Sequence, residues 1–175
     1  MIGPHAVVID ASIALAIVRA EPEAPAVTAA LSEWTRAGAR TVVPSHFWLE
    51  VANALLTRRR WTGEKVLQAI HELDRFRFET IDLDRAALLL TLDIGERHGL
   101  TTYDAAYLSL AISLDGSLAT FDVALRTAAG TRALHLGPAR LSETPAVYEH
   151  DVTWPNYKGA SAFLAKLRAE AARPG

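Results

Sequence analysis

Residues 6–15, "AVVIDASIAL", decide how the fold begins. The run 6–9 is short, apolar and partly β-branched, which is typical of a buried strand. "SIALAIVRAE" follows with helical character, and Ser12 is a candidate N-cap for that helix. Between the two lies Asp10, a carboxylate at the tip of a core strand. Its meaning depends on whether other acids in the chain come close to it.

The same strand-then-helix order continues along the chain. Short strands are expected at 40–44, 78–83, 117–121 and 132–137, and helices at 24–38, 45–61, 62–76, 84–99, 101–116 and 122–130. This alternation predicts an α/β fold in which helix layers flank a parallel sheet. The core is expected to span residues 1–137. Residues 138–175 form a C-terminal extension of unknown role, in which "ASAFLAKLRAEAA" could be a terminal helix.

Composition narrows the class of protein. The chain has 175 residues, of which 50% are apolar and 22% charged, so one domain with a sizeable core is expected. A net charge of −2 gives no bulk attraction for nucleic acid, so any such contact needs a local patch. The absence of cysteine excludes disulfides and thiolate chemistry. No apolar run reaches membrane-spanning length, and no signal peptide is evident, so we expect a cytoplasmic protein.

Four acids lie in apolar segments rather than on charged faces. They are Asp10, Glu50, Asp104 and Asp122. Asp10 and Asp122 each follow a predicted strand, and ligands of α/β sheets bind outside such carboxyl ends, so the two are expected to be neighbours. Each acid also has a structural interpretation. The three aspartates could cap or begin helices, and Glu50 could be a solvated position on an amphipathic helix.

Taken together, the four acids suggest a metal centre. Clustered carboxylates repel one another, and burying them unpaired is costly, unless a divalent cation compensates their charge. Hard ions such as Mg²⁺ or Mn²⁺ prefer oxygen ligands and keep room for water and phosphate oxygens. Such a centre supports metal-assisted hydrolysis of a phosphodiester.

Four segments, taken in order, resemble the motifs of PIN-domain ribonucleases of the VapC type. They are "VVIDASIAL", "FWLEVANAL", "GLTTYDAAYLSLA" and "LATFDVALRTAA", and the resemblance covers residues 5–137. It implies a three-layer sandwich with a central, mainly parallel sheet. The family's acidic quartet falls on the four acids above, as catalytic residues and metal ligands. The resemblance also implies residues that do not bind the metal but support its carboxylate ligands. They are Ser12, Asn53 and Thr120. The tail after Pro138 departs from the family pattern.

The resemblance also implies a function. A VapC-type protein is an endoribonuclease that hydrolyses RNA with metal-bound water, and one or two metals remain open. It acts as the toxin of a toxin–antitoxin pair, is inhibited by a VapB-like antitoxin, and commonly forms a homodimer. Alternatives are a PIN nuclease of RNA processing or quality control, and a PIN fold without catalysis that binds RNA or protein.

One basic run stands apart from the acids. A predicted helix ends in Arg58, Arg59, Arg60 and Trp61. The arginines could contact RNA phosphates and the tryptophan could stack on a base. Alternatively, the arginines are cations that are favourable at a helix C-terminus. The histidines are scattered without metal-ligand spacing, and they are interpreted as structural or surface residues. They are His5, His46, His71, His98, His135 and His150.

Overall fold

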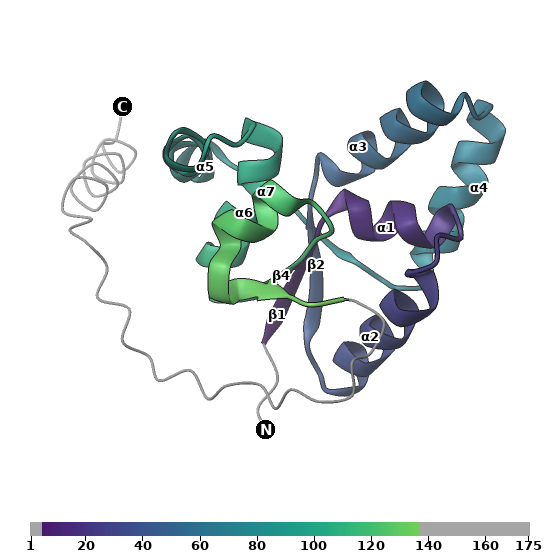
Figure 1. Cartoon of the computed structure of the whole chain (residues 1–175), viewed down its shortest axis with the longest axis horizontal. Helices are drawn as coiled ribbons and strands as arrows, with labels where there is room; N and C mark the ends of the chain where they lie inside the picture. The colour runs from purple at the N-terminus through teal and green to yellow at the C-terminus, as the bar shows by residue number, and fades with distance from the viewer. Residues whose placement is uncertain (1–4, 137–175) are drawn as a thin grey trace, which may run out of the picture. The chain divides into compact units, whose positions relative to one another are not determined.

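The computed structural model describes residues 5–136, which form a parallel sheet with helices on both sides (Figure 1). The strands are β1 (Ala6–Ile9), β2 (Arg40–Pro44), β3 (Glu79–Ile81), β4 (Ser117–Ala119) and β5 (Ala133–Leu134). The α-helices are α1 (Ala11–Val18), α2 (Ala24–Arg36), α3 (Phe47–Asn53), α4 (Gly63–Asp74), α5 (Arg85–His98), α6 (Thr102–Ser113) and α7 (Val123–Ala129). The predicted α/β sandwich is confirmed. The extension 138–175 and its expected helix lie outside the described residues.

The strand order reverses its direction at the centre of the sheet. The order is β3-β2-β1-β4-β5, and all neighbouring strands are parallel. The chain therefore winds outward in one direction from β1 to β3, and in the other from β4 to β5. In Figure 1, α1 to α4 lie on one side of the sheet and α5 to α7 on the other. Such a reversal of strand order beside β1 is where α/β sheets bind ligands, outside the strands' carboxyl ends.

The core explains why β1 and α6 lie at the centre. All four residues of β1 are buried, as expected for a strand that is covered on both faces. Residues 105–111 of α6 are buried without interruption, so this helix is enclosed on all sides rather than amphipathic. These two buried elements fix the position of the strand-order reversal beside β1. Within 5–136, no helix is both long and apolar enough to cross a membrane.

Several local features differ from the sequence-based expectation. The N-cap of α1 is Asp10, not Ser12, because Asp10 has extended backbone angles and its carboxylate faces the Ser12 amide. Ser45 makes no cap for α3, which begins after His46. The strands β3, β4 and β5 are shorter than predicted.

The helix predicted at 45–61 is not continuous. α3 runs into a π-helical turn at Ala54–Arg58, and the chain then reverses through Arg60, whose φ is +53°. The Thr57 hydroxyl donates to the Asn53 carbonyl inside this turn. π-Helical turns recur at functional sites, and this one begins four residues after Glu50.

Gly116 allows β1 and β4 to approach, and its replacement is expected to destabilise the fold. A Cβ at this position would lie 2.7 Å from the Ala6 carbonyl oxygen, a backbone atom that cannot rotate away. Gly116→Ala should lower the free energy of unfolding by about 1–3 kcal/mol, the usual range for overpacking. Gly63→Ala is the matched control, because a Cβ there meets nothing within 4 Å. Urea unfolding curves measure both, and equal stability of the two variants would contradict the prediction.

Candidate active site

Asp10 is the buried centre of the site. It follows β1, is 3% exposed, and its backbone amide donates to Ala119 of the neighbouring strand β4 at 3.0 Å. Its Oδ2 accepts hydrogen bonds from the Ser12 hydroxyl and, at 2.7 Å, from the Thr120 hydroxyl. Burial raises the pKa of this carboxyl, and these hydrogen bonds only partly oppose the rise. The protein therefore buries a carboxylate whose charge no cation within residues 5–136 balances.

The two hydroxyls that hold Asp10 also hold the segment after β4. Ser12 Oγ accepts from the Phe121 amide at 3.0 Å, and Thr120 Oγ1 accepts from the Asp122 amide at 2.9 Å. Each hydroxyl thus donates to Asp10 and accepts from the β4–α7 connection. This arrangement fixes the backbone of Asp122 relative to the carboxylate of Asp10.

Glu50 lies in α3 and turns toward the interior rather than toward solvent. It is half-buried, and its Oε2 accepts a hydrogen bond of 2.9 Å from the hydroxyl of the fully buried Tyr107. Burial raises the pKa of Glu50; the Tyr107 hydrogen bond lowers it, and the charges of Asp10 and Asp104 raise it further. Glu50 is therefore within electrostatic reach of both Asp10 and Asp104. The solvated interpretation of Glu50 does not apply.

Asp104 and Asp122 are directed at helix starts. In the first turn of α6, Asp104 Oδ2 accepts from the Thr101 hydroxyl at 2.6 Å, while Thr101 Oγ1 accepts from the Asp104 amide. Asp122 is exposed and caps α7, with its Oδ1 accepting from the Leu125 amide at 2.7 Å. Asp122 is therefore the N-cap of α7, and Asp104 is an acid in the first turn of α6, whose N-cap is Thr101. Each of these contacts occupies one carboxylate oxygen, which leaves its second oxygen for another partner.

The donor set suits a hard divalent cation, although the side chains do not form a closed coordination shell. Within residues 5–136, no three acidic or histidine side chains lie close enough together to hold a metal ion. The carboxylates nevertheless have the chemistry of a Mg²⁺ or Mn²⁺ site. No cation within residues 5–136 acts on Asp10, and Glu50 bears the unfavourable charge of two acids against one opposing cation, Arg58. Such uncompensated charge is what a bound divalent ion would offset.

The other predicted site residues differ in exposure and in their distance from the acids. Asn53 is exposed at the end of α3, and its side chain makes no hydrogen bond with a described residue. Arg58 lies near enough to Glu50 for its charge to lower the pKa of that carboxyl. Trp61 is partly buried against the core, and Lys65 Nζ lies 4.0 Å from its ring centroid, so one candidate stacking face is already covered.

The sequence predicts no site role for two residues that lie beside the acids. Tyr107 lies in the apolar helix predicted at 101–116, and the sequence does not single it out. It follows Asp104 by three positions and therefore lies on the same face of α6 as Asp104. The sequence predicts His46 to be a structural or surface residue. Its ring packs against Tyr107 and Tyr103, with centroids 5.1 and 5.8 Å away. Burial lowers the pKa of His46, while the Tyr103 backbone and the charge of Asp104 partly oppose this.

Comparisons with known proteins agree with this fold. The family model of the PIN domain matches residues 7–131. No curated protein sequence matches the chain significantly. A toxin–antitoxin complex from Klebsiella pneumoniae is 16% identical with a TM-score of 0.58, covering 76% of this chain and 99% of the matched one.

Two further solved structures are similar. VapBC2 from Rickettsia felis, bound to a DNA fragment from its promoter, is 18% identical with a TM-score of 0.53, covering 67% of this chain and 88% of the other. A protein from Pyrobaculum aerophilum is 23% identical with a TM-score of 0.52, covering 70% and 78%. At these identities the likeness establishes the fold.

Proposed function

The chain belongs to the PIN-domain family, and from that premise we propose that it is a metal-dependent endoribonuclease acting as a VapC-type toxin. The observation that carries the proposal is the placement of Asp10. A buried carboxylate lies at the reversal of strand order in the sheet, within electrostatic reach of Glu50, which also feels Asp104. Uncompensated negative charge at this place favours a divalent cation over a neutral ligand.

The metal ligands in this proposal are the four predicted acids. Asp10 would offer the oxygen that Ser12 and Thr120 do not hold, and Glu50 the one that Tyr107 does not hold. Asp104 and Asp122 would complete the site from α6 and the start of α7. A Mg²⁺ or Mn²⁺ ion bound here supplies an activated water and charge stabilisation for phosphodiester hydrolysis.

The chain's own residues contribute orientation. The hydroxyls of Ser12 and Thr120 fix Asp10, as supporting hydrogen bonds commonly do for ligands. Tyr107 fixes Glu50 in the same way. Arg58, whose charge reaches Glu50, is the member of the basic run best placed to bind an RNA phosphate. Arg59, Arg60 and Trp61 remain predicted RNA contacts, and Asn53 a predicted supporting residue.

A cleavage assay tests the function. We expect the purified protein to cut structured RNA in Mg²⁺ or Mn²⁺ and to lose all cleavage in EDTA. Glu50→Gln should lower the cleavage rate by about 10²-fold or more, as for the loss of one main electrostatic group. Asp82→Asn, an exposed acid outside the site, is the matched control and should cleave normally. Undiminished cleavage in EDTA, or equal rates of Glu50→Gln and wild type, would contradict the assignment.

The proposed biological setting is a cytoplasmic toxin–antitoxin pair. Structures similar to this chain include a toxin–antitoxin complex and a VapBC assembly, which supports a VapB-like antitoxin as partner. A homodimer is part of the proposal, and Leu49, 75% exposed on α3, is the kind of apolar surface a second copy would cover. Expression should arrest bacterial growth, and co-expression of a small protein encoded beside it should restore growth. Growth arrest by a Glu50→Gln variant would argue against toxicity through cleavage.

A further inference from the structure

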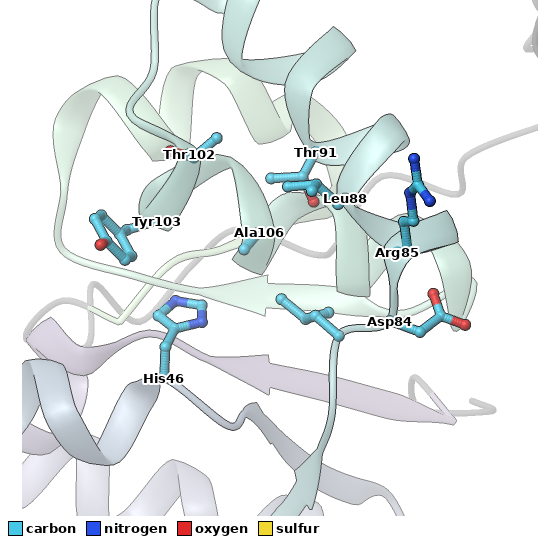
Figure 2. Close-up of a pocket in the computed structure, with 9 residues that line it drawn as sticks. His46, Asp84, Arg85, Leu88, Thr91, Thr102, Tyr103 and Ala106 are labelled. Atoms are coloured by element: carbon cyan, nitrogen blue, oxygen red, sulfur yellow. The ribbon is translucent and has the colours of Figure 1, made fainter.

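A pocket of about 380 Å³ opens beside the candidate active site (Figure 2). It lies between the start of α3, the segment that leads into α5, and the first turns of α6. Residues that shape it are His46, Leu83, Arg85, Leu88, Tyr103 and Ala106. Its volume falls within the range of small-ligand pockets, about 300–1,000 Å³. None of the functional roles described so far uses it.

The walls of the pocket are aromatic and apolar, with a polar edge. Tyr103 is 66% exposed although it is a large ring, and it stands 5.8 Å from the His46 ring at an interplanar angle of 55°. Leu88 and Ala106 line the apolar part, as Figure 2 shows. The His46 Nε2 atom is buried and makes no hydrogen bond with any residue in 5–136. Flat apolar walls with one unused hydrogen-bonding atom suit a planar heteroaromatic ligand.

One wall of the pocket is linked to the acids by side-chain contacts. The His46 ring packs edge-on against Tyr107, whose hydroxyl binds Glu50. Tyr103 immediately precedes Asp104, and the Asp104 charge acts on His46. A ligand in the pocket would therefore lie next to a phosphate held at the carboxylates.

The rim carries one positive charge, Arg85, in an unusual place, next to the negative charge of Asp84, which also lines the pocket. Arg85 is exposed and occupies the first position of α5, directly after the N-cap Asp84. A cation at a helix N-terminus opposes the helix dipole, so its place there is not explained by helix stability. A nearby nucleic-acid phosphate would explain it, because guanidinium groups pair well with phosphate.

We propose that this pocket binds one base of the RNA next to the phosphate to be cut, with the base stacked on Tyr103 and its edge facing His46. The proposal rests on the proposed ribonuclease function. RNA is favoured over a protein partner because one site combines an exposed aromatic ring, an unused ring nitrogen, a rim cation and side-chain contacts that lead to the acids. Arg85 would hold the phosphate on the outer side of that base.

Binding of model RNAs tests the pocket without cleavage. The full chain carrying Asp10→Asn is titrated, with Mg²⁺ present, into labelled oligo(U) and oligo(A) of about 12 nucleotides and into an abasic ribose-phosphate chain of equal length. Fluorescence anisotropy gives each Kd. Adding Tyr103→Leu should weaken binding of the base-containing oligomers about tenfold and leave binding of the abasic chain unchanged. Tyr103→Phe keeps the ring and should restore binding. Leu67→Ala, an equally exposed apolar residue on α4, should have no effect.

The outcomes separate the two proposals. If otherwise wild-type protein cleaves RNA but Tyr103→Leu binds and cleaves as well as the parent, the base pocket is wrong and the ribonuclease stands. The same holds if Tyr103→Leu weakens the abasic chain equally, or changes only the elution volume of the protein, which would identify the pocket as a protein contact. If the protein without substitutions neither binds nor cleaves any RNA, the ribonuclease proposal fails and the base pocket fails with it.

Discussion

Asp10→Asn is expected to abolish RNA cleavage and, at the same time, to make the metal-free protein more stable. The loss of activity should reach about 10²–10³-fold or more, because the substitution removes a main electrostatic group of the site. Asparagine has nearly the shape of aspartate and keeps an oxygen that can accept from Ser12 and Thr120. The fold should therefore survive, and only the charge is lost.

The gain in stability follows from the raised pKa of Asp10 in the folded state. Below its ordinary value of 3.8, the carboxyl is protonated in both states and burial of its charge costs nothing. As pH rises, the unfolded chain releases this proton first, so the folded state is progressively disfavoured until the folded pKa is passed. At pH 7 wild type bears a cost of burying this carboxyl that Asp10→Asn lacks.

Thermal unfolding with and without metal measures this effect. In EDTA at pH 7, Asp10→Asn should melt above wild type, with about 2–4 °C for each kcal/mol gained in a chain of this length. The gap should shrink toward pH 4. Mg²⁺ or Mn²⁺ should raise the Tm of wild type and barely affect the variant, since only wild type binds the ion tightly. A variant that melts below wild type in EDTA would show that the Asp10 charge is not a burden on the fold.

Much of the site could be predicted because it depends on topology. Once residues 6–9 and 117–121 are read as parallel strands, Asp10 and the segment with Thr120 and Asp122 must meet at one edge of the sheet. The structure places Asp10 and Thr120 in direct hydrogen-bond contact. The order of strands and helices followed from the same alternation of apolar runs.

The features that sequence reasoning missed depend on side-chain packing. Tyr107 reads as one more core aromatic, and only its position beside Glu50 gives its hydroxyl a role. The role of His46 depends on its contacts with the rings of Tyr103 and Tyr107, which lie 57 and 61 positions further along the chain. The π-helical turn after α3 also has no signal, because its residues suit an ordinary α-helix equally well.

The second large effect is expected from Tyr107→Phe, which removes a single buried hydroxyl. Tyr107 is fully buried, and burial together with the charge of Glu50 raises its pKa, so the hydroxyl stays protonated and donates throughout the working pH range. Without this donor, the half-buried Glu50 side chain loses the one hydrogen bond that it makes with a residue in 5–136. Loss of a group that orients a ligand typically costs about 10–100-fold in activity or metal affinity, and we expect about tenfold in kcat/KM at pH 7.

The pH profile distinguishes this role from simple packing. The Tyr107 hydrogen bond lowers the pKa of Glu50 against the larger rise caused by burial, so its removal should raise that pKa further. If ionised Glu50 is the active form, the acid limb of the kcat/KM profile moves to higher pH, and the variant loses more activity at pH 6 than at pH 8. Ser109→Ala removes another buried hydroxyl from α6, one that makes no hydrogen bond, and should leave the profile in place. A uniform drop across all pH values would mean that Tyr107 supports the fold without tuning Glu50.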